Sequence, residues 1–183
     1  MIYVVDNNIF SHALNNQMPF DVFDIIWKSW ERLIEEQRII SVSEVLCELE
    51  VKWKIKKGEE WDWLMKHREC FVKPTNEECE IVSKIFSFTK FREGVKEKSI
   101  RAGTPEADAF LVAKAKAIDG IIVTAEKDAP HSEKIPCIAS EFDVPYMKEQ
   151  DFFRMLRNIN DGNDELKNVT IYYKLGVPTL QKE

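Results

Sequence analysis

The sequence predicts a three-layer α/β/α sandwich with a central parallel sheet, and three observations predict it. Short apolar runs rich in β-branched residues recur along the chain, and strands buried on both faces of a parallel sheet have this composition. These runs alternate with amphipathic helical patterns, as right-handed crossovers between parallel strands require. The chain has 183 residues, of which 44% are hydrophobic and 32% are charged, so it fits one globular domain and not a disordered or low-complexity protein.

The first elements are predicted from the patterns nearest the N-terminus. Residues 2–5 form a short apolar strand. Asp21 is then placed to cap a helix, because apolar residues recur at three- and four-residue steps over 23–34. A second strand is predicted at 38–42, and Ser43 can cap the helix that follows it.

The middle of the chain is predicted to be a charged helical insert over about 53–101. Inside it, Thr75 is followed three residues later by Glu78, which is the signature of a capping box at the start of a helix. Further along, Thr104 is predicted to cap a helix that Gly120 ends.

The last elements alternate in the same way. We expect a third strand at 121–124 and a fourth at 136–139, and then a helix at about 151–158. Residues 169–173 form a strand or a strap in the tail. The alternation of strand and helix therefore continues to about residue 157.

Composition also excludes several classes of protein. No apolar run approaches the roughly 20 residues of a membrane span, and the N-terminus has neither a basic region nor a cleavage site, so we expect a cytoplasmic protein without membrane contact. The four cysteines have no CxxC spacing and are predicted to be free core thiols. The three histidines form no HxH or HExxH pattern, which argues against zinc.

The net charge of −6 disfavours binding of nucleic acid by the whole surface. Two local clusters are basic, one with four lysines over 52–57 and one with six basic residues over 84–101. Such clusters are ordinarily solvated helix surfaces, and they are also able to lie along a nucleic-acid backbone.

Acidic side chains follow or flank the predicted strands. Six residues share this placement: Asp6, Glu44, Glu48, Asp108, Glu126 and Asp128. Each acid taken alone is also explained as a turn residue or as an acid in the first turn of a helix. Because ligands bind beyond the carboxyl ends of parallel strands, however, these acids are expected to converge. Carboxylates without histidine or cysteine favour hard ions such as Mg²⁺ or Mn²⁺.

Four segments together resemble the PIN-domain ribonucleases, the fold of many toxins in toxin–antitoxin pairs. They are YVVDNNIF at 3–10, ISVSEVLCELE at 40–50, EADAFLVAKA at 106–115 and IIVTAEKD at 121–128. The resemblance extends to about residue 157, because the segment KIPCIASEFDVPYMKEQDFFRML looks like one PIN-like subgroup of unassigned function. It implies a PIN-like nuclease domain at 1–157, with the helical insert at about 53–101, and a C-terminal extension at 158–183.

Carried over residue by residue, the resemblance implies catalytic and metal-binding roles for Asp6, Glu48, Asp108 and Glu126. Thr124 and Asn7 are implied to be supporting polar groups. The implied cofactor is Mg²⁺ or Mn²⁺, which would lower the pKa of a bound water and offset charge on the leaving oxygen.

Two positions of this implied site have rivals. Glu44 lies one helical turn before Glu48 and competes with it for the helix ligand. The family usually has an aspartate two residues after the threonine at the strand end, and here that place holds Glu126. Asp128 is a possible substitute for it.

The resemblance implies a metal-dependent endoribonuclease that is the toxin of a toxin–antitoxin pair. The partners it implies are an RNA substrate, an antitoxin protein and a second copy of the chain, for which the tryptophan-rich helices offer an interface. The alternative is a PIN-like module that has lost catalysis and binds RNA or protein. Phosphoaspartate receivers and DxD phosphatases fit less well because Asn7 and Asn8 follow Asp6, and no GxGxxG motif for a dinucleotide occurs.

Overall fold

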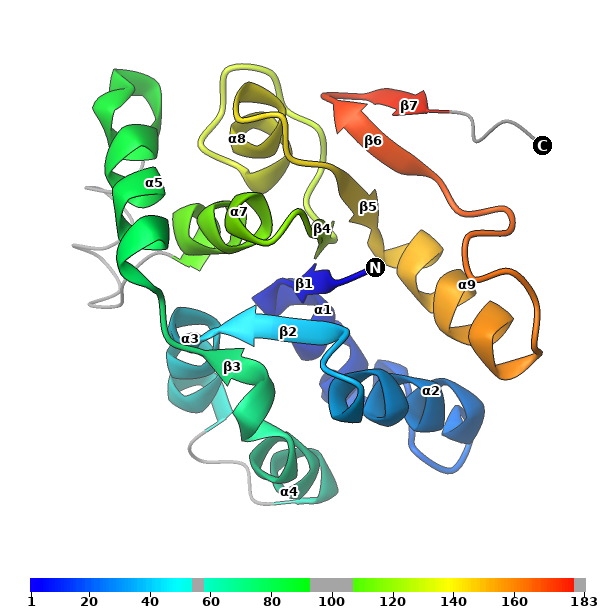
Figure 1. Cartoon of the computed structure of the whole chain (residues 1–183). Helices are drawn as coiled ribbons and strands as arrows, with labels where there is room; N and C mark the ends of the chain where they lie inside the picture. Colours follow the sequence, from blue (N-terminus) through cyan, green and yellow to red (C-terminus); the bar gives the residue numbers. More distant parts are fainter. Residues whose placement is uncertain (54–57, 93–106, 180–183) are drawn as a thin grey trace.

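The protein forms a twisted sheet between two layers of helices in the computed structural model (Figure 1), which describes residues 1–53, 58–92 and 107–179. Within these ranges seven strands form one sheet in the order β3-β2-β1-β4-β5-β6-β7. Their bounds are β1 Tyr3–Val5, β2 Ile39–Val42, β3 Phe71–Val72, β4 Ile121–Thr124, β5 Tyr146–Lys148, β6 Ile171–Lys174 and β7 Val177–Thr179. The predicted fold class, an α/β/α sandwich around a mainly parallel sheet, is confirmed.

The helices divide between the two faces of the sheet. Those described are α1 Asn7–His12, α2 Asp24–Glu35, α3 Ser43–Trp53, α4 Glu59–Lys66, α5 Asn76–Ser87, α7 Ala107–Ala117, α8 Ile135–Glu141 and α9 Glu149–Asn160. Helices α5, α7 and α8 cover one face, and α1, α2 and α9 cover the other (Figure 1). The packing of α5 on α7 and of α2 on α9 agrees with this division. A π-helical turn at Ala13–Gln17 continues α1, and a 3₁₀ turn at Arg68–Cys70 precedes β3.

The order of the strands places a crevice between β1 and β4. The chain starts at β1 in the centre, moves outward through β2 and β3, and then returns to place β4 on the other side of β1. Strands β1 to β5 are parallel, whereas β6 and β7 are antiparallel. In such a sheet the point where the order reverses opens at the carboxyl ends of the two strands. Asp6 and Ala125 are the next residues there.

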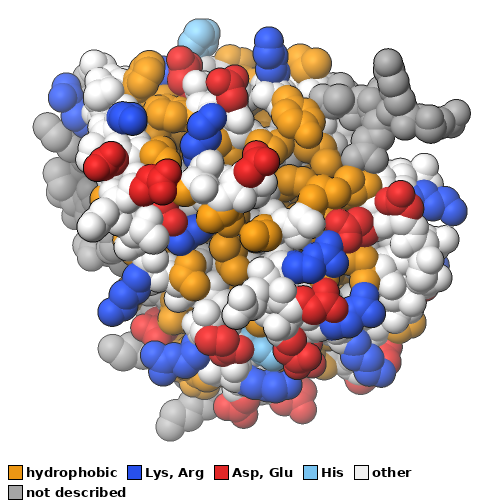
Figure 2. Space-filling model, in the orientation of Figure 1, with side chains coloured by type: hydrophobic (Ala, Val, Ile, Leu, Met, Phe, Trp, Pro, Cys, Tyr) orange, Lys and Arg blue, Asp and Glu red, His pale blue; other side chains and the backbone are white. Residues whose placement is uncertain are grey.

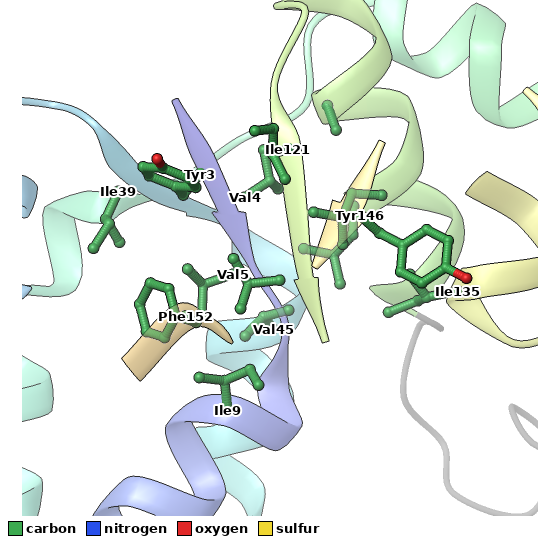
Figure 3. Close-up of a cluster of buried hydrophobic side chains, with 14 of the residues drawn as sticks. Tyr3, Val4, Val5, Ile9, Ile39, Val45, Ile121, Ile135, Tyr146 and Phe152 are labelled. Carbon is green, nitrogen blue, oxygen red and sulfur yellow. The ribbon is translucent and has the colours of Figure 1, made fainter. Parts of the chain in front are cut away.

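The central strands are fixed by complete burial. Tyr3, Val4 and Val5 of β1 have no exposed surface, and Figure 3 shows their side chains beside those of Ile121 on β4 and Phe152 on α9. Since well-packed interiors are rigid, the residues that follow β1 and β4 are held in defined positions.

A second part of the core is aromatic. The rings of Trp27 and Trp30 stack with centroids 5.3 Å apart, and Trp63 packs edge-on against both. All three indoles are buried, so these tryptophans of α2 and α4 belong to the core and not to an exposed interface.

Several local predictions are confirmed. Strands occur at Tyr3–Val5, Ile39–Val42 and Ile121–Thr124. The Thr75 hydroxyl accepts the Glu78 N–H while the Glu78 carboxylate accepts the Thr75 N–H, which is the predicted capping box of α5. The predicted cap at Thr104 lies outside the described residues.

Other local predictions are wrong. The strand predicted at 136–139 is the helix α8, and Pro136 occupies its first turn, where the missing N–H of proline costs nothing. The strand in this region is β5, which starts directly after Pro145. The segment predicted to be purely helical contains β3, and α2 starts at Asp24 and is not capped by Asp21.

Helix α7 ends where it was predicted to end, just before Gly120. The left-handed residue there is Asp119, with φ of 53°, and not the glycine. The Gly120 N–H then closes the helix by donating to the carbonyl of Ala115. A Cβ on Gly120 would lie 3.3 Å from the Ile2 carbonyl oxygen, so this glycine is needed for the close approach of α7 to β1.

The surface charges and the cysteines were also the subject of expectations from composition. Figure 2 shows acidic and basic side chains interspersed over the face in view. Parts of both basic clusters, residues 54–57 and 93–101, lie outside the described ranges. All four cysteines are free, but only Cys70 and Cys137 are buried, so the expectation of core thiols is wrong for Cys47 and Cys79. None of the described helices combines the length and the apolar character needed to cross a membrane.

Candidate active site

A pocket of about 230 Å³ opens at the carboxyl ends of β1 and β4. Its lining residues are all polar or charged: Asp6, Asn7, Asn8, Ser11, His12, Glu48, Asp108 and Glu126. Four acids that the sequence singled out therefore come together from four separate segments of the chain. We call this the acidic pocket.

Asp6 lies at the bottom of the acidic pocket with only 3% of its surface exposed. It follows β1 directly, and its backbone N–H extends the ladder by donating to Val123 O on β4. Burial raises the pKa of the Asp6 carboxyl to about 7; the neighbouring Glu126 and Glu48 add to the rise, and the hydrogen bond from Thr124 opposes it. A bound cation would offset the part of this rise that comes from repulsion by Glu126 and Glu48.

Glu48 is held in the acidic pocket by residues from two other helices. Asn7 Nδ2 donates to Glu48 Oε2 at 2.6 Å, and the Ala107 N–H at the start of α7 donates to Glu48 Oε1 at 3.4 Å. Ser11 Oγ, one turn along α1, donates in turn to Asn7 Oδ1 at 2.9 Å. The carboxylate of Glu48 is thus positioned between α1 and the first turn of α7, which carries Asp108.

Glu44, the rival of Glu48 on α3, is placed elsewhere. It does not line the acidic pocket, and its carboxylate accepts a hydrogen bond from Ser43 Oγ at 3.1 Å. The two glutamates lie four residues apart, but only Glu48 reaches the pocket.

Thr124 connects the two central strands at the base of the acidic pocket. Its hydroxyl donates to Asp6 Oδ2 at 2.9 Å and accepts from Asn8 Nδ2 and from the Glu126 N–H. Asn8 Oδ1 also accepts the Ala125 N–H at 2.9 Å. These bonds join α1 to the loop after β4, so Asp6 and Glu126 are positioned by one hydrogen-bond network.

Glu126 and Asp128 face different surroundings. Glu126 lines the acidic pocket, and its Oε2 accepts the N–H of Ile135 at the start of α8. Asp128 does not line it; its Oδ1 accepts from Tyr146 Oη at 2.9 Å and from Lys148 Nζ at 2.7 Å. Asp128 therefore fixes the loop to β5, whereas Glu126 remains available to the pocket.

The donor set of the acidic pocket fits a hard cation in its chemistry. It offers four carboxylates together with the side-chain oxygens of asparagine and serine, which are ligands of Mg²⁺ and Mn²⁺. In the described part of the chain, no group of three or more His, Cys, Asp or Glu residues is already close enough to hold a metal ion.

Sequence reasoning missed three residues of the acidic pocket: Asn8, Ser11 and His12. Asn8 and Ser11 carried a usable signal, since Asn8 is the second asparagine after Asp6 and Ser11 lies one helical turn after Asn7. His12 carried the same signal, because it lies one helical turn after Asn8, but its contact with Glu149, 137 residues away, could not be predicted; His12 Nδ1 lies 2.9 Å from Glu149 Oε1.

Comparison with known proteins gives one family. No curated protein matches the chain. Among solved structures, the chain is similar to the crystal structure of VapBC2 from Rickettsia felis bound to a DNA fragment from their promoter, with 19% sequence identity and a TM-score of 0.44 over 69% of this chain and 88% of that chain. Residues 3–160 match the family described as "Domain of unknown function (DUF4411)", and since this match spans most of the sequence, the chain belongs to that family.

Proposed function

We propose that this protein is a metal-dependent endoribonuclease that hydrolyses RNA phosphodiester bonds, and that it is the toxin of a toxin–antitoxin pair. The observation that carries the proposal is the convergence of four carboxylates in the acidic pocket, at the switch point of a parallel sheet. The resemblance of the segments around these acids to PIN-domain ribonucleases supports the choice of reaction.

In this proposal each residue of the pocket has a defined task. Asp6, Glu48, Asp108 and Glu126 would hold Mg²⁺ or Mn²⁺, which when bound lowers the pKa of a water and offsets charge on the leaving oxygen. Asn7 positions Glu48, and Thr124 positions Asp6, through the hydrogen bonds described above. Fixing both carboxylates in advance reduces the reorganisation that catalysis would otherwise require.

The proposal extends to partners, location and domain organisation. An antitoxin protein and a second copy of the chain are its expected partners, and the four free cysteines agree with a reducing compartment such as the cytoplasm. We propose residues 1–157 as the nuclease domain and 158–183 as an extension, whose strands β6 and β7 lengthen the sheet beyond β5.

The test is cleavage of a labelled single-stranded RNA by the purified protein with Mn²⁺ or Mg²⁺. Asp6→Asn and Asp108→Asn should remain folded by circular dichroism and lose cleavage by about a hundredfold or more, because each removes a charge from the acidic pocket. Asp21→Asn, at an exposed aspartate outside the pocket, is the control and should cleave normally. Undiminished cleavage after thorough chelation would refute the role of the metal.

A second candidate is a module that binds RNA or protein without cutting it. Glu126 favours it, since the longer side chain stands where the family usually has aspartate and one of its oxygens is occupied by the Ile135 N–H. Thermal denaturation with and without Mn²⁺ separates the two candidates. A nuclease should melt at a higher temperature when the ion is present, and an inactive module should not.

A further inference from the structure

A larger groove adjoins the acidic pocket. It has a volume of about 580 Å³ and is lined by the end of α1, by residues before and within α2, and by α9. His12 lines both the groove and the acidic pocket, so the two spaces are adjacent at this residue. We call this the flanking groove.

One wall of the flanking groove is apolar and partly exposed. Met18, Phe23, Ile26 and Phe153 line it, and the Phe23 residue is 37% exposed. Solvent-accessible aromatic rings of this kind are the surfaces on which nucleic-acid bases stack, without preference for sequence. The wall can therefore hold a planar, uncharged group.

The other wall is basic. Arg154 and Arg157 lie three residues apart on the same side of α9, and both line the groove. Arg154 is fixed, since its guanidinium donates to Asp151 Oδ1 at 2.6 Å and to the Asn168 carbonyl at 2.9 Å. Arg157 is three-quarters exposed and lies 3.6 Å from Asp161, a long distance for an ion pair. Its guanidinium can reach an anion in the groove.

His12 lines both the flanking groove and the acidic pocket, and Glu149 fixes the orientation of its ring. Glu149 Oε1 lies 2.9 Å from His12 Nδ1, which fixes the plane of the ring and leaves Nε2 as the nitrogen that a ligand could engage. Glu149 also lines the flanking groove, and its Oε1 is engaged by the histidine.

We propose that the flanking groove binds one nucleotide of a single-stranded RNA, the neighbour of the phosphodiester at the acidic pocket. This inference rests on the proposed function and adds the site that positions the substrate. The base would lie on the wall of Phe23 and Phe153, and Arg157 would contact a phosphate. A groove of this volume suits a ligand the size of a nucleotide, and its position next to the acidic pocket favours RNA over a peptide.

Binding of a fluorescently labelled single-stranded RNA of ten nucleotides, measured by anisotropy in EDTA, tests this site without cleavage. Arg157→Glu should weaken binding about fivefold or more, because it replaces a cation with an anion beside the phosphates. Its matched control is Arg32→Glu, since Arg32 is also a helical arginine with a carboxylate four residues on at 3.7 Å, but it does not line the groove. The control should change binding less than twofold.

The apolar wall of the flanking groove is tested in the same assay. Phe23→Ala should weaken binding about fivefold, the loss of one base–aromatic contact. Phe88→Ala is its control, because Phe88 has a similar exposed fraction of 39% and lies outside the groove, after α5. Circular dichroism of all four variants checks that each is folded.

The outcomes separate this proposal from the proposed function. If the two groove variants bind RNA as well as their controls do, the nucleotide site is overturned, and a protein partner becomes the occupant to test. The same preparations are then given Mn²⁺: cleavage by the wild type that Asp6→Asn lacks would uphold the nuclease even when the groove proposal fails. If both groove variants bind RNA more weakly than their controls but the wild type does not cleave RNA, the nucleotide site is upheld and the nuclease is refuted.

Discussion

Thr124 shows how a side chain outside the lining of the acidic pocket still determines its arrangement. Its hydroxyl is its only side-chain proton donor, and it donates to Asp6, while its oxygen accepts from Asn8 and from the Glu126 N–H. Two of the four acids therefore depend on one buried hydroxyl. At the scale of single residues, the site consists of the carboxylates and of the neutral groups that aim them.

The raised pKa of Asp6 leads to a pH dependence of stability. The folded protein binds a proton at Asp6 with a pKa of about 7, whereas the ordinary pKa of an aspartate, which applies in the unfolded chain, is 3.8. Between these values the folded state holds the proton and the unfolded state does not, so raising the pH destabilises the fold by up to about 1.4 kcal/mol per unit. The cost is complete above pH 7 and absent below pH 4.

We therefore expect Asp6→Asn, compared with the wild type in EDTA, to melt at a higher temperature at pH 8 and at nearly the same temperature at pH 4. Other ionisable groups are common to both proteins, so the difference isolates Asp6. Melting curves across this range measure it. A difference that does not grow with pH would contradict the buried, repelled carboxylate.

The choice between Glu48 and Glu44 gives a second prediction at this scale. Glu48→Gln should lower cleavage of RNA by about a hundredfold, because it removes a charge from the acidic pocket, and Glu44→Gln should lower it less than about threefold. Initial rates at saturating Mn²⁺ compare them. The reverse ranking would move the helix ligand back by one turn.

The site residues that could be predicted from the sequence are those whose position follows from a single strand or helix. Asp6 and Glu126 follow strand ends, and parallel strands bring their carboxyl ends to one edge. The phase of α3 could not be fixed from sequence, because Glu44 and Glu48 lie on nearly the same helix face. The contact of His12 with Glu149 could not be predicted, because the two residues are distant in sequence.

Helices α5 and α7 are joined by a buried ion pair that also belongs to the cap of α5. Glu78 Oε2 accepts the Thr75 N–H, and Glu78 Oε1 lies 2.7 Å from Lys114 Nζ. Both charged side chains are about 95% buried, so neither can be solvated by water if its partner is lost. The pair sets the position of α7, whose first turn carries Asp108.

Lys114→Met should lower the free energy of unfolding by about 3 kcal/mol, because it leaves the Glu78 carboxylate buried without its cation. Lys116→Met is the matched control, since Lys116 lies two residues along the same helix and is exposed; it should change stability by less than about 0.5 kcal/mol. Urea denaturation measures both. Equal losses of stability in the two variants would show that the buried ion pair contributes no more than an exposed lysine does.

At the scale of elements, the strands that coincide with a run of apolar residues were predictable and the others were not. The runs at Tyr3–Val5, Ile39–Val42 and Ile121–Thr124 predicted β1, β2 and β4, whereas β3 has only two residues and β5 has the sequence YMK. Segment 136–139 is as apolar as a strand but is a helix, because Glu126 accepts the Ile135 N–H at its start. A hydrogen bond between residues nine apart cannot be predicted from the pattern of hydrophobic residues.

The segment after α9 contacts the first two strands at their amino ends, away from the acidic pocket. Glu165 accepts the Tyr3 hydroxyl at 2.8 Å and pairs with Arg38, so the C-terminal segment contacts β1 and the residue before β2. Burial, together with the bond to Glu165, raises the pKa of the Tyr3 hydroxyl, and the pairing with Glu165 raises the pKa of Arg38. We call this contact the Glu165 clasp.

Glu165→Ala should lower the free energy of unfolding by about 2 kcal/mol, because it leaves the buried Tyr3 hydroxyl without its acceptor. Glu36→Ala is the control on the same arginine: Glu36 is nearly half exposed and lies 3.6 Å from Arg38, so its loss should cost less than about 1 kcal/mol. Thermal and urea denaturation compare the two. A larger loss for Glu36→Ala would contradict the clasp.

The Glu165 clasp forms late during synthesis of the protein on the ribosome. Tyr3 and Arg38 emerge early, but the carboxylate that satisfies both is translated only after nearly all of the remaining chain. β4, the neighbour of β1, arrives late as well. A nascent chain that stops before β4 would therefore leave β1 paired on one side only and would lack Glu126, the last of the four acids of the pocket.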